Sequence, residues 1–324
     1  MDTHNIIELL SSSKDRVPAL HKWLKENVWS STRFNSMKPE DYLEQGEKQI
    51  CKIEELVLGS AYGIYDGLAA AAGSAGKIFE TVGDKKPYAM VVFDGASIRE
   101  LPLFEKMAIS SGFKIVESRY DIAALPSDTA HFVEQRILGK PGISPSSLAG
   151  RKEFAEMGIT AHYYDSVIRN FELPADKQNL LLWSHFPDAT YQDFDSRFSS
   201  HFGEICRLFD TVWKNIILAI PKGYHIIVTS DHGYIFLGQG LESTIFADAA
   251  KILNQDRFRF YEENEELPDE TQGLQIVPQK RLAMLRGRIK NRPHGQAGNK
   301  SYRHGGMSLM EMLTPWLVIE QEGH

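Results

Sequence analysis

HIIVTSDHGY, residues 225–234, is the stretch from which the fold of this chain is inferred. The apolar run Ile226–Val228 predicts a short buried strand. Asp231 and His232 follow it, and Gly233 lets the backbone turn sharply. At the carboxyl edge of a parallel sheet such side chains can point into the crevice where ligands bind, and an oxygen beside a nitrogen suits a zinc-like cation. The alternative is a turn with two solvated polar residues.

The composition is that of an ordinary globular enzyme. The chain has 324 residues, of which 42% are hydrophobic and 24% charged, enough for one large domain or two modest ones. The net charge of −7 excludes a global basic field that would draw the chain to nucleic acid or membrane. Cys51 and Cys206 are too few for a disulfide framework. Without a signal-peptide pattern or a run of about 18 apolar residues, we expect a cytoplasmic protein that does not enter the membrane.

Residues 1–84 are expected to form a helical N-terminal segment. Apolar residues recur at helical spacing from Ile6 onward, and Pro39 stands where a first helical residue is expected. The Ala- and Gly-rich stretch 67–73 indicates a helix in close packing. This segment contains no recognisable chemistry, so we interpret it as a cap on the main domain or a docking surface for a partner.

Residues 85–324 are expected to form a single α/β domain. Strands and helices alternate with short connections, which favours a mostly parallel central sheet with helices on both faces. The expected strands are 88–93, 112–119, 180–183, 226–228 and 316–319, and the expected helices are 98–111, 130–138 and 198–220.

Residues that can bind a metal follow three of these strands. They are Asp94, Asp188 and the pair of Asp231 with His232, and His304 beside two glycines is a fourth position. Thr129 opens a helix, where the positive end of the helix dipole attracts anions. Two cations about 4 Å apart can hold the attacking and leaving oxygens of a phosphoryl group, and a bound metal would make the threonine hydroxyl a nucleophile.

The order of these motifs resembles the alkaline phosphatase superfamily and, within it, the PglZ domain. The likeness spans residues 86–320 and rests on VVFDG at 91–95, LPSDTA at 125–130 with Gly139-Lys140, VTSDHG at 228–233 and RHGGMSLME at 303–311.

The resemblance implies two metal sites, with zinc expected and manganese as the alternative. The first site would contain Asp94, Thr129, Asp231 and His232. The second would contain an Asp, a His four residues later and a late His. Asp188 and His304 match two of these positions, but Gln192 occupies the third, and an amide oxygen is a poor zinc ligand. His185 or His201 is an alternative third ligand.

The resemblance also implies an activity. Thr129 would attack phosphorus in line, and the phosphothreonyl enzyme would then be hydrolysed. A plain helix cap is the alternative role for Thr129, and Ser127 or Asp128 could equally take that position. We expect His225 to be a structural histidine, and we give His131 no role.

A locally basic segment, residues 279–304, favours a nucleotide or oligonucleotide phosphodiester as substrate. It includes Arg288 and Arg303 among eight cations, as well as His294. A docking site for an acidic partner and a lid over the site are alternatives.

PglZ proteins occur in bacterial phage-defence systems of the BREX kind, so a defence role with protein partners is implied. A scaffold that kept the fold and lost efficient catalysis is the rival interpretation, motivated by Gln192. A sulfatase is disfavoured because residues 126–129 lack the Cys/Ser-x-Pro-x-Arg motif, and no feature supports a phosphomutase.

Overall fold

A six-stranded sheet forms the centre of the molecule, with the strand order β2-β11-β5-β1-β4-β3. The computed structural model describes residues 3–59, 62–82, 87–167, 173, 178–193, 198–238, 240–265, 272–292 and 301–321. The strands of the sheet are β1 (Tyr88–Phe93), β2 (Phe113–Ile122), β3 (Ile159–Tyr164), β4 (Asn179–Ser184), β5 (His225–Ser230) and β11 (Leu313–Gln321). β1 lies parallel to β4 and β5, whereas β11 is antiparallel to both of its neighbours. The predicted mostly parallel sheet is therefore confirmed.

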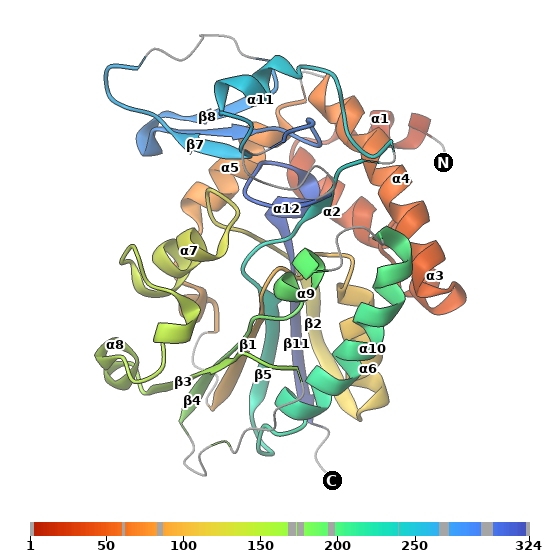
Figure 1. Cartoon of the computed structure of the whole chain (residues 1–324). Helices are drawn as coiled ribbons and strands as arrows, with labels where there is room; N and C mark the ends of the chain where they lie inside the picture. Colours follow the sequence, from red (N-terminus) through yellow and green to blue (C-terminus); the bar gives the residue numbers. More distant parts are fainter. Residues whose placement is uncertain are drawn as a thin grey trace.

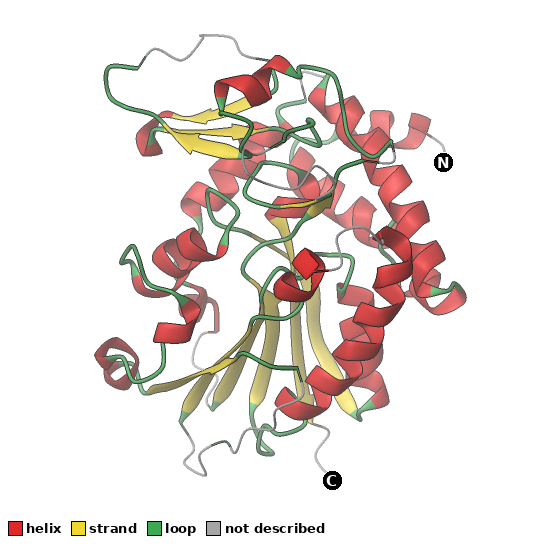
Figure 2. Cartoon of the chain, viewed as in Figure 1, coloured by secondary structure: helices red, strands yellow, loops and turns green. Residues whose placement is uncertain are grey.

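Both faces of the sheet are covered, as predicted (Figures 1 and 2). In β1 the side chains alternate, so that Val91 and Phe93 join one hydrophobic core while Met90 and Val92 join another. The first core contains α6 (Leu101–Ser110) and α10 (Phe198–Ile216). The second contains α7 (Thr129–Phe132), the π-helix η2 (Val133–Leu138), α8 (Lys152–Glu156) and η1 (Ile78–Val82).

The N-terminal segment is helical, as predicted. Its helices are α1 (Thr3–Ser12), α2 (Arg16–Asn27), α3 (Ser31–Ser36), α4 (Pro39–Leu58) and α5 (Ile64–Ser74). Their buried apolar side chains belong to the same core as one face of the central sheet. α4 also buries two acids, Glu47 and Glu54, against residues from much later in the chain. The division into 1–84 and 85–324 stays a prediction.

Residues 235–303 contain short strands that the sequence did not predict. β7 (Phe258–Phe260), β9 (Leu282–Leu285) and β8 (Leu274–Val277) form a three-stranded antiparallel sheet, with β7 at one edge. This sheet lies beyond one end of the central sheet (Figure 2). β6 (Ile235–Phe236) pairs with β10 (Tyr302–Arg303). Strands of two to four residues are too short to show a clear apolar alternation.

The remaining elements are short. They are η3 (Pro145–Ser147), α9 (Asp188–Asp193), α11 (Asp248–Ile252), η5 (Pro278–Lys280) and α12 (Leu309–Met312). Gly139 has a φ of 76° and ends η2, as expected for the predicted helix 130–138. α10 ends at Ile216, four residues before the predicted end. Among the described residues, none of the helices combines the length and the apolar character needed to cross a lipid bilayer.

Candidate active site

The carboxyl ends of β1, β4 and β5 meet at one edge of the sheet because these strands are parallel. Asp94 directly follows β1, Asp231 directly follows β5, and Asp188 is the first residue of α9, four residues after β4. The backbone links these loops. Asp94 N donates to Ser184 O at 2.9 Å, and Asp188 N donates to Asp94 O at 2.9 Å. These bonds hold Asp94 and Asp188 side by side, and the pairing of β1 with β5 brings Asp231 to the same edge.

Thr129 is the first residue of α7, and its hydroxyl is not used to cap that helix. The N-cap is Asp128, whose Oδ1 accepts a hydrogen bond from His131 N at 2.8 Å. The Thr129 Oγ1 atom instead lies 2.7 Å from Asp231 Oδ2 and 3.2 Å from Asp94 Oδ1. The alternative in which Thr129 is a plain helix cap is therefore wrong.

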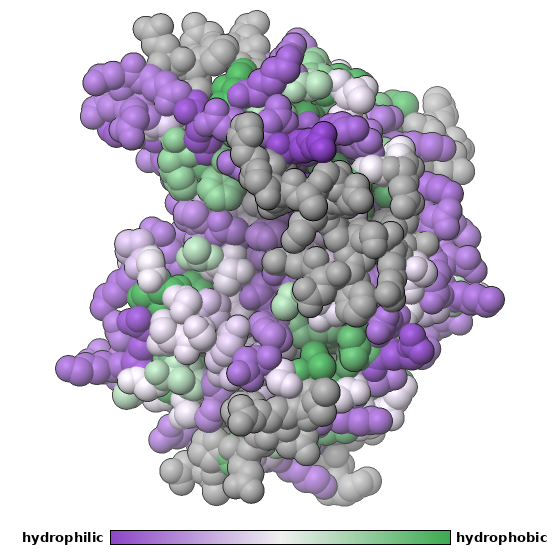
Figure 3. Space-filling view, in the orientation of Figure 1, coloured by the Kyte–Doolittle hydropathy of each residue, from purple (hydrophilic) through white to green (hydrophobic). Residues whose placement is uncertain are grey.

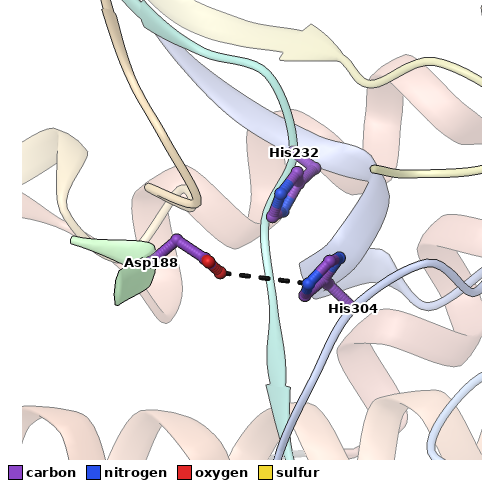
Figure 4. Close-up of side chains that lie close together, drawn as sticks. All are labelled: Asp188, His232 and His304. Atoms are coloured by element: carbon purple, nitrogen blue, oxygen red, sulfur yellow. Dashed lines mark ion pairs between the residues drawn. The ribbon is translucent and has the colours of Figure 1, made fainter. Parts of the chain in front are cut away.

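Two groups of metal-capable side chains surround this hydroxyl. In the first, one donor atom from each of Asp94, Asp231 and His232 lies within 4.8 Å of the others, and Asp188, His232 and His304 form the second group in the same way. His232 and His304 stack with ring centroids 4.2 Å apart, and His304 Nε2 lies 3.9 Å from Asp188 Oδ1 (Figure 4).

Six of the seven side chains predicted to form the metal sites thus converge on one place. The seventh, Gln192, belongs to α9, but its side chain lies outside the described residues. Its two suggested replacements are turned to other neighbours. The ring of His185 packs against Tyr163 at 6.3 Å, and the ring of His201 packs against Tyr191 at 5.5 Å. Neither histidine belongs to a metal-capable group of the described residues.

The first group is buried and strongly acidic. Asp231 and His232 are fully buried, whereas His304 keeps 29% of its side chain exposed. Burial raises the pKa of Asp94 well above its ordinary value, and the nearby Asp231 and Asp188 raise it further. No lysine or arginine of the described residues forms an ion pair with Asp94 or Asp231. Such a cluster is stabilised by added positive charge, so the donor set fits divalent cations.

The two histidines differ in their electrostatics. Burial lowers the pKa of His232, but Asp231, Asp94 and Asp188 outweigh it and raise the pKa to about 9. Its Nδ1 lies 2.9 Å from the Gly233 carbonyl oxygen, which only accepts hydrogen bonds, so Nδ1 bears a proton and Nε2 faces Thr129 at 3.3 Å. Burial and the nearby His232 lower the pKa of His304, which favours the neutral ring that a metal requires.

Sequence reasoning missed three groups that hold these acids in place. Tyr302 Oη donates to Asp188 Oδ1 at 2.6 Å, Trp183 Nε1 donates to Asp94 Oδ2 at 3.4 Å, and Gly95 N donates to Asp231 Oδ1 at 3.0 Å. Gly95 has a φ of 70°, and a Cβ there would lie 2.9 Å from both Asp188 Cβ and Tyr302 Oη. In the sequence, only the glycine directly after Asp94 indicates this close approach.

A buried network positions the loop that contains His304. Glu311 accepts hydrogen bonds from Gly306 N at 2.8 Å and Ser308 N at 3.1 Å, and Arg257 forms an ion pair with it. Ser127 Oγ donates to Gly306 O at 2.7 Å, which ties this loop to the turn before Thr129.

The N-terminal segment also supports this loop. Glu54 of α4 accepts a hydrogen bond from Leu309 N at the start of α12, and its Oε2 lies 3.7 Å from Arg288 Nε. The segment therefore packs directly behind the candidate site. Its interpretation as a docking surface for a partner stays a prediction.

Replacing Glu54 with glutamine should stabilise the protein relative to wild type as the pH rises from 5 to 8. Burial is the main reason that the pKa of Glu54 rises from 4.5 to about 7. The pKa of Glu54 is higher in the folded protein than in the unfolded chain. The stability that its protonated carboxyl contributes is therefore fully present below pH 4.5 and is lost as the pH rises through 7. This shift in pKa corresponds to a loss of about 3 kcal/mol in the unfolding free energy of the wild-type protein. Urea unfolding of the wild-type and Glu54→Gln proteins at pH 5 and pH 8 measures this loss. If the two proteins differed in unfolding free energy by the same amount at both pH values, the raised pKa of Glu54 would be contradicted.

The prediction that the basic segment 279–304 faces the substrate is wrong for Arg288. Its side chain is 1% exposed and forms an ion pair with Glu47 of α4. Arg303 is also buried. Three more of the predicted cations pair with acids: Arg281 with Glu263, Arg286 with Asp66 and Lys290 with Glu242. Residues 293–300, which include His294 and much of the suggested lid, lie outside the described residues.

The structure also places the two histidines for which we expect no part in the chemistry. His225 is buried in β5, and its Nδ1 lies 2.6 Å from Glu320 Oε1, which confirms a structural position. His131, which received no role, lies at the rim of the site, with its Nδ1 2.7 Å from Asp128 Oδ1.

Comparisons with known proteins find one matching family model and similar solved structures. Residues 189–319 match the BREX system PglZ alkaline phosphatase-like domain, which confirms the resemblance seen in the motifs. Among solved structures, the chain is similar to murine ectonucleotide pyrophosphatase / phosphodiesterase 5, with 14% identity over 72% of this chain and 88% of that chain and a TM-score of 0.45. The inactive form of that protein in complex with AMP gives the same values. No curated protein sequence matches this chain.

Proposed function

We propose that this chain, whose residues 189–319 form a PglZ alkaline phosphatase-like domain, is a metal-dependent phosphodiesterase that acts on nucleotides or oligonucleotides. One observation carries the proposal. The Thr129 hydroxyl lies within 3.3 Å of polar atoms from Asp94, Asp231 and His232, which come from two other loops. A threonine hydroxyl is a weak nucleophile until a neighbouring group activates it, and this arrangement provides such groups.

The side chains of the site have definite tasks in the proposed reaction. Thr129 donates its hydroxyl hydrogen bond to Asp231 Oδ2, so a carboxylate stands ready to accept the proton as Oγ1 attacks phosphorus. The Oγ1–phosphorus bond forms while the bond to the leaving oxygen breaks. Water then hydrolyses the phosphothreonyl ester and restores the hydroxyl. Tyr302 keeps Asp188 in place throughout.

Two divalent cations, zinc or alternatively manganese, complete the proposed site. Asp94, Thr129, Asp231 and His232 would hold one, and Asp188 and His304 would hold the other with Gln192 nearby in the chain. When bound, these cations supply positive charge that stabilises the charge developing on the phosphoryl oxygens and lowers the pKa of the threonine hydroxyl.

The biological setting is proposed from the family alone. The matching domain is described as part of the BREX system, so we propose a cytoplasmic role in bacterial phage defence with protein partners from that system. The overall charge of −7 favours a locally held substrate over wide electrostatic attraction of nucleic acid.

Hydrolysis of bis(p-nitrophenyl) phosphate by the purified protein tests this function. We expect turnover with added zinc or manganese, loss of turnover with excess EDTA, and recovery when the metal is restored. The monoester p-nitrophenyl phosphate should be cleaved more slowly. A rate with metal no higher than that of buffer, or one that EDTA leaves unchanged, would overturn the assignment.

A scaffold that has lost efficient catalysis is the second candidate. Gln192 stands where the family pattern places a histidine, and this observation favours it. Metal analysis of the purified protein separates the two. Two transition-metal ions per chain support the enzyme, and none supports the scaffold.

A further inference from the structure

Three aromatic side chains gather at the rim of the candidate site. Phe258 and Phe260 are two apart on β7, so they lie on the same face of this edge strand. The ring of His131 lies 5.4 Å from that of Phe260 and 5.9 Å from that of Phe258. The two phenylalanine rings are 6.1 Å apart. We call His131, Phe258 and Phe260 the aromatic platform.

The platform connects the two sides of the site. His131 is two residues after Thr129 on α7, and its Nδ1 is held 2.7 Å from Asp128 Oδ1, which fixes the ring. Phe258 packs against the loop of the late histidine, because a Cβ on Gly305 would lie 2.9 Å from Phe258 Cδ1. A molecule placed on the platform is therefore adjacent both to the helix of the proposed nucleophile and to the His304 loop.

Phe260 is exposed although nothing in its strand requires an aromatic residue there. It keeps 47% of its surface accessible, and it is the one aromatic residue among the seven large hydrophobic side chains exposed in the described part of the chain. Figure 3 shows hydrophobic surface inside an indentation between the part of the molecule that carries β7 and the part that carries α7. An exposed ring near the charged side chains of the candidate site favours a ligand with both a planar and a charged part.

We propose that the aromatic platform binds the nucleobase of the substrate by stacking on the exposed ring of Phe260, against which His131 and Phe258 are packed. This inference rests on the proposed function and names the part of the substrate that its site would recognise. Every base has a π-face, so stacking detects that a base is present without reading which base it is. Arg259, between the two phenylalanines, points to the other face of β7 and pairs with Glu265, so it is engaged away from the platform. The platform thus selects nucleotides over simple phosphoesters.

Binding of AMP and of ribose 5-phosphate to the full-length Thr129→Ala protein with zinc, measured by titration calorimetry, tests this inference. The two probes share the sugar and the phosphate and differ in the base. We expect AMP to bind about tenfold more tightly, which corresponds to about 1.4 kcal/mol and lies within the roughly 1–3 kcal/mol that stacking contributes per base. Adding Phe260→Ala should bring the ratio close to one, while Phe260→Trp should keep it.

Ile109→Ala is the matched control, since Ile109 is 66% exposed on α6 and belongs to no part of the site. It should leave the tenfold ratio unchanged. Equal affinities for the two probes in the starting protein, or an equal loss in the Ile109 and Phe260 variants, would overturn the inference. Because this test needs no turnover, a protein that fails to hydrolyse phosphodiesters yet prefers AMP through Phe260 would refute the proposed function alone.

Discussion

Thr129→Ala is expected to abolish phosphodiester hydrolysis while leaving the fold intact. The hydroxyl is the atom on which Asp94, Asp231 and His232 converge, and no other described hydroxyl contacts the side chains of all three. Removal of an enzyme nucleophile lowers kcat by roughly three to six orders of magnitude. Thr129 is half-buried and does not cap its helix, so the loss of two heavy atoms should change the unfolding free energy by less than about 1 kcal/mol.

Two further variants show whether this loss is chemical. Thr129→Ser keeps a hydroxyl at the same place and should retain much of the wild-type rate. Thr160→Ala removes a threonine hydroxyl from the edge strand β3, where it donates a hydrogen bond to Gln178 away from the candidate site, and should be neutral. Rates for the chromogenic diester, with circular dichroism as a check on folding, decide the matter. A Thr129→Ala protein as active as wild type would show that another group attacks phosphorus.

Glu47→Gln should destabilise the protein by about 3–5 kcal/mol, the cost of breaking a buried ion pair from one side. Glu47 is fully buried on α4 and lies between the guanidinium groups of Arg99 and Arg288, both also buried. Burial opposes ionisation of Glu47, but Arg288 and Arg99 outweigh it and lower its pKa. Glutamine would leave two buried cations without their shared negative charge.

Urea unfolding at pH 7 measures the expected loss, with Glu44→Gln as the control. Glu44 lies on the same helix but is exposed, and its pair with Lys48 is worth at most about 0.5 kcal/mol. A Glu47→Gln protein within 1 kcal/mol of Glu44→Gln would mean that the N-terminal helix is not electrostatically fixed to the later loops.

The centre of the fold was predictable because its signals are local. β1 is a continuous apolar run and β5 contains the apolar run Ile226–Val228, as expected for strands buried on both faces. Parallel strands bring their carboxyl ends together, so Asp94 and Asp231 could be placed in one crevice without coordinates. The order of the motifs then added Thr129 and His304.

What could not be predicted depends on partners far apart in the chain. In the sequence, Arg288 has the pattern of a surface cation. Its ion-pair partner Glu47 lies 241 residues earlier, and no local sequence feature of either residue predicts the pair. Tyr302 likewise supports Asp188 across 114 residues. The aromatic platform escaped notice because β7 spans only three residues, too few for periodicity to identify a strand.

The most direct measurement is anomalous X-ray diffraction from crystals of the full-length protein grown with zinc. The account predicts two peaks about 4 Å apart, the spacing of two-metal phosphoryl-transfer sites. One should lie among Asp94, Thr129, Asp231 and His232, and the other beside Asp188 and His304. Zinc bound only elsewhere, or no zinc at this edge of the sheet, would contradict it.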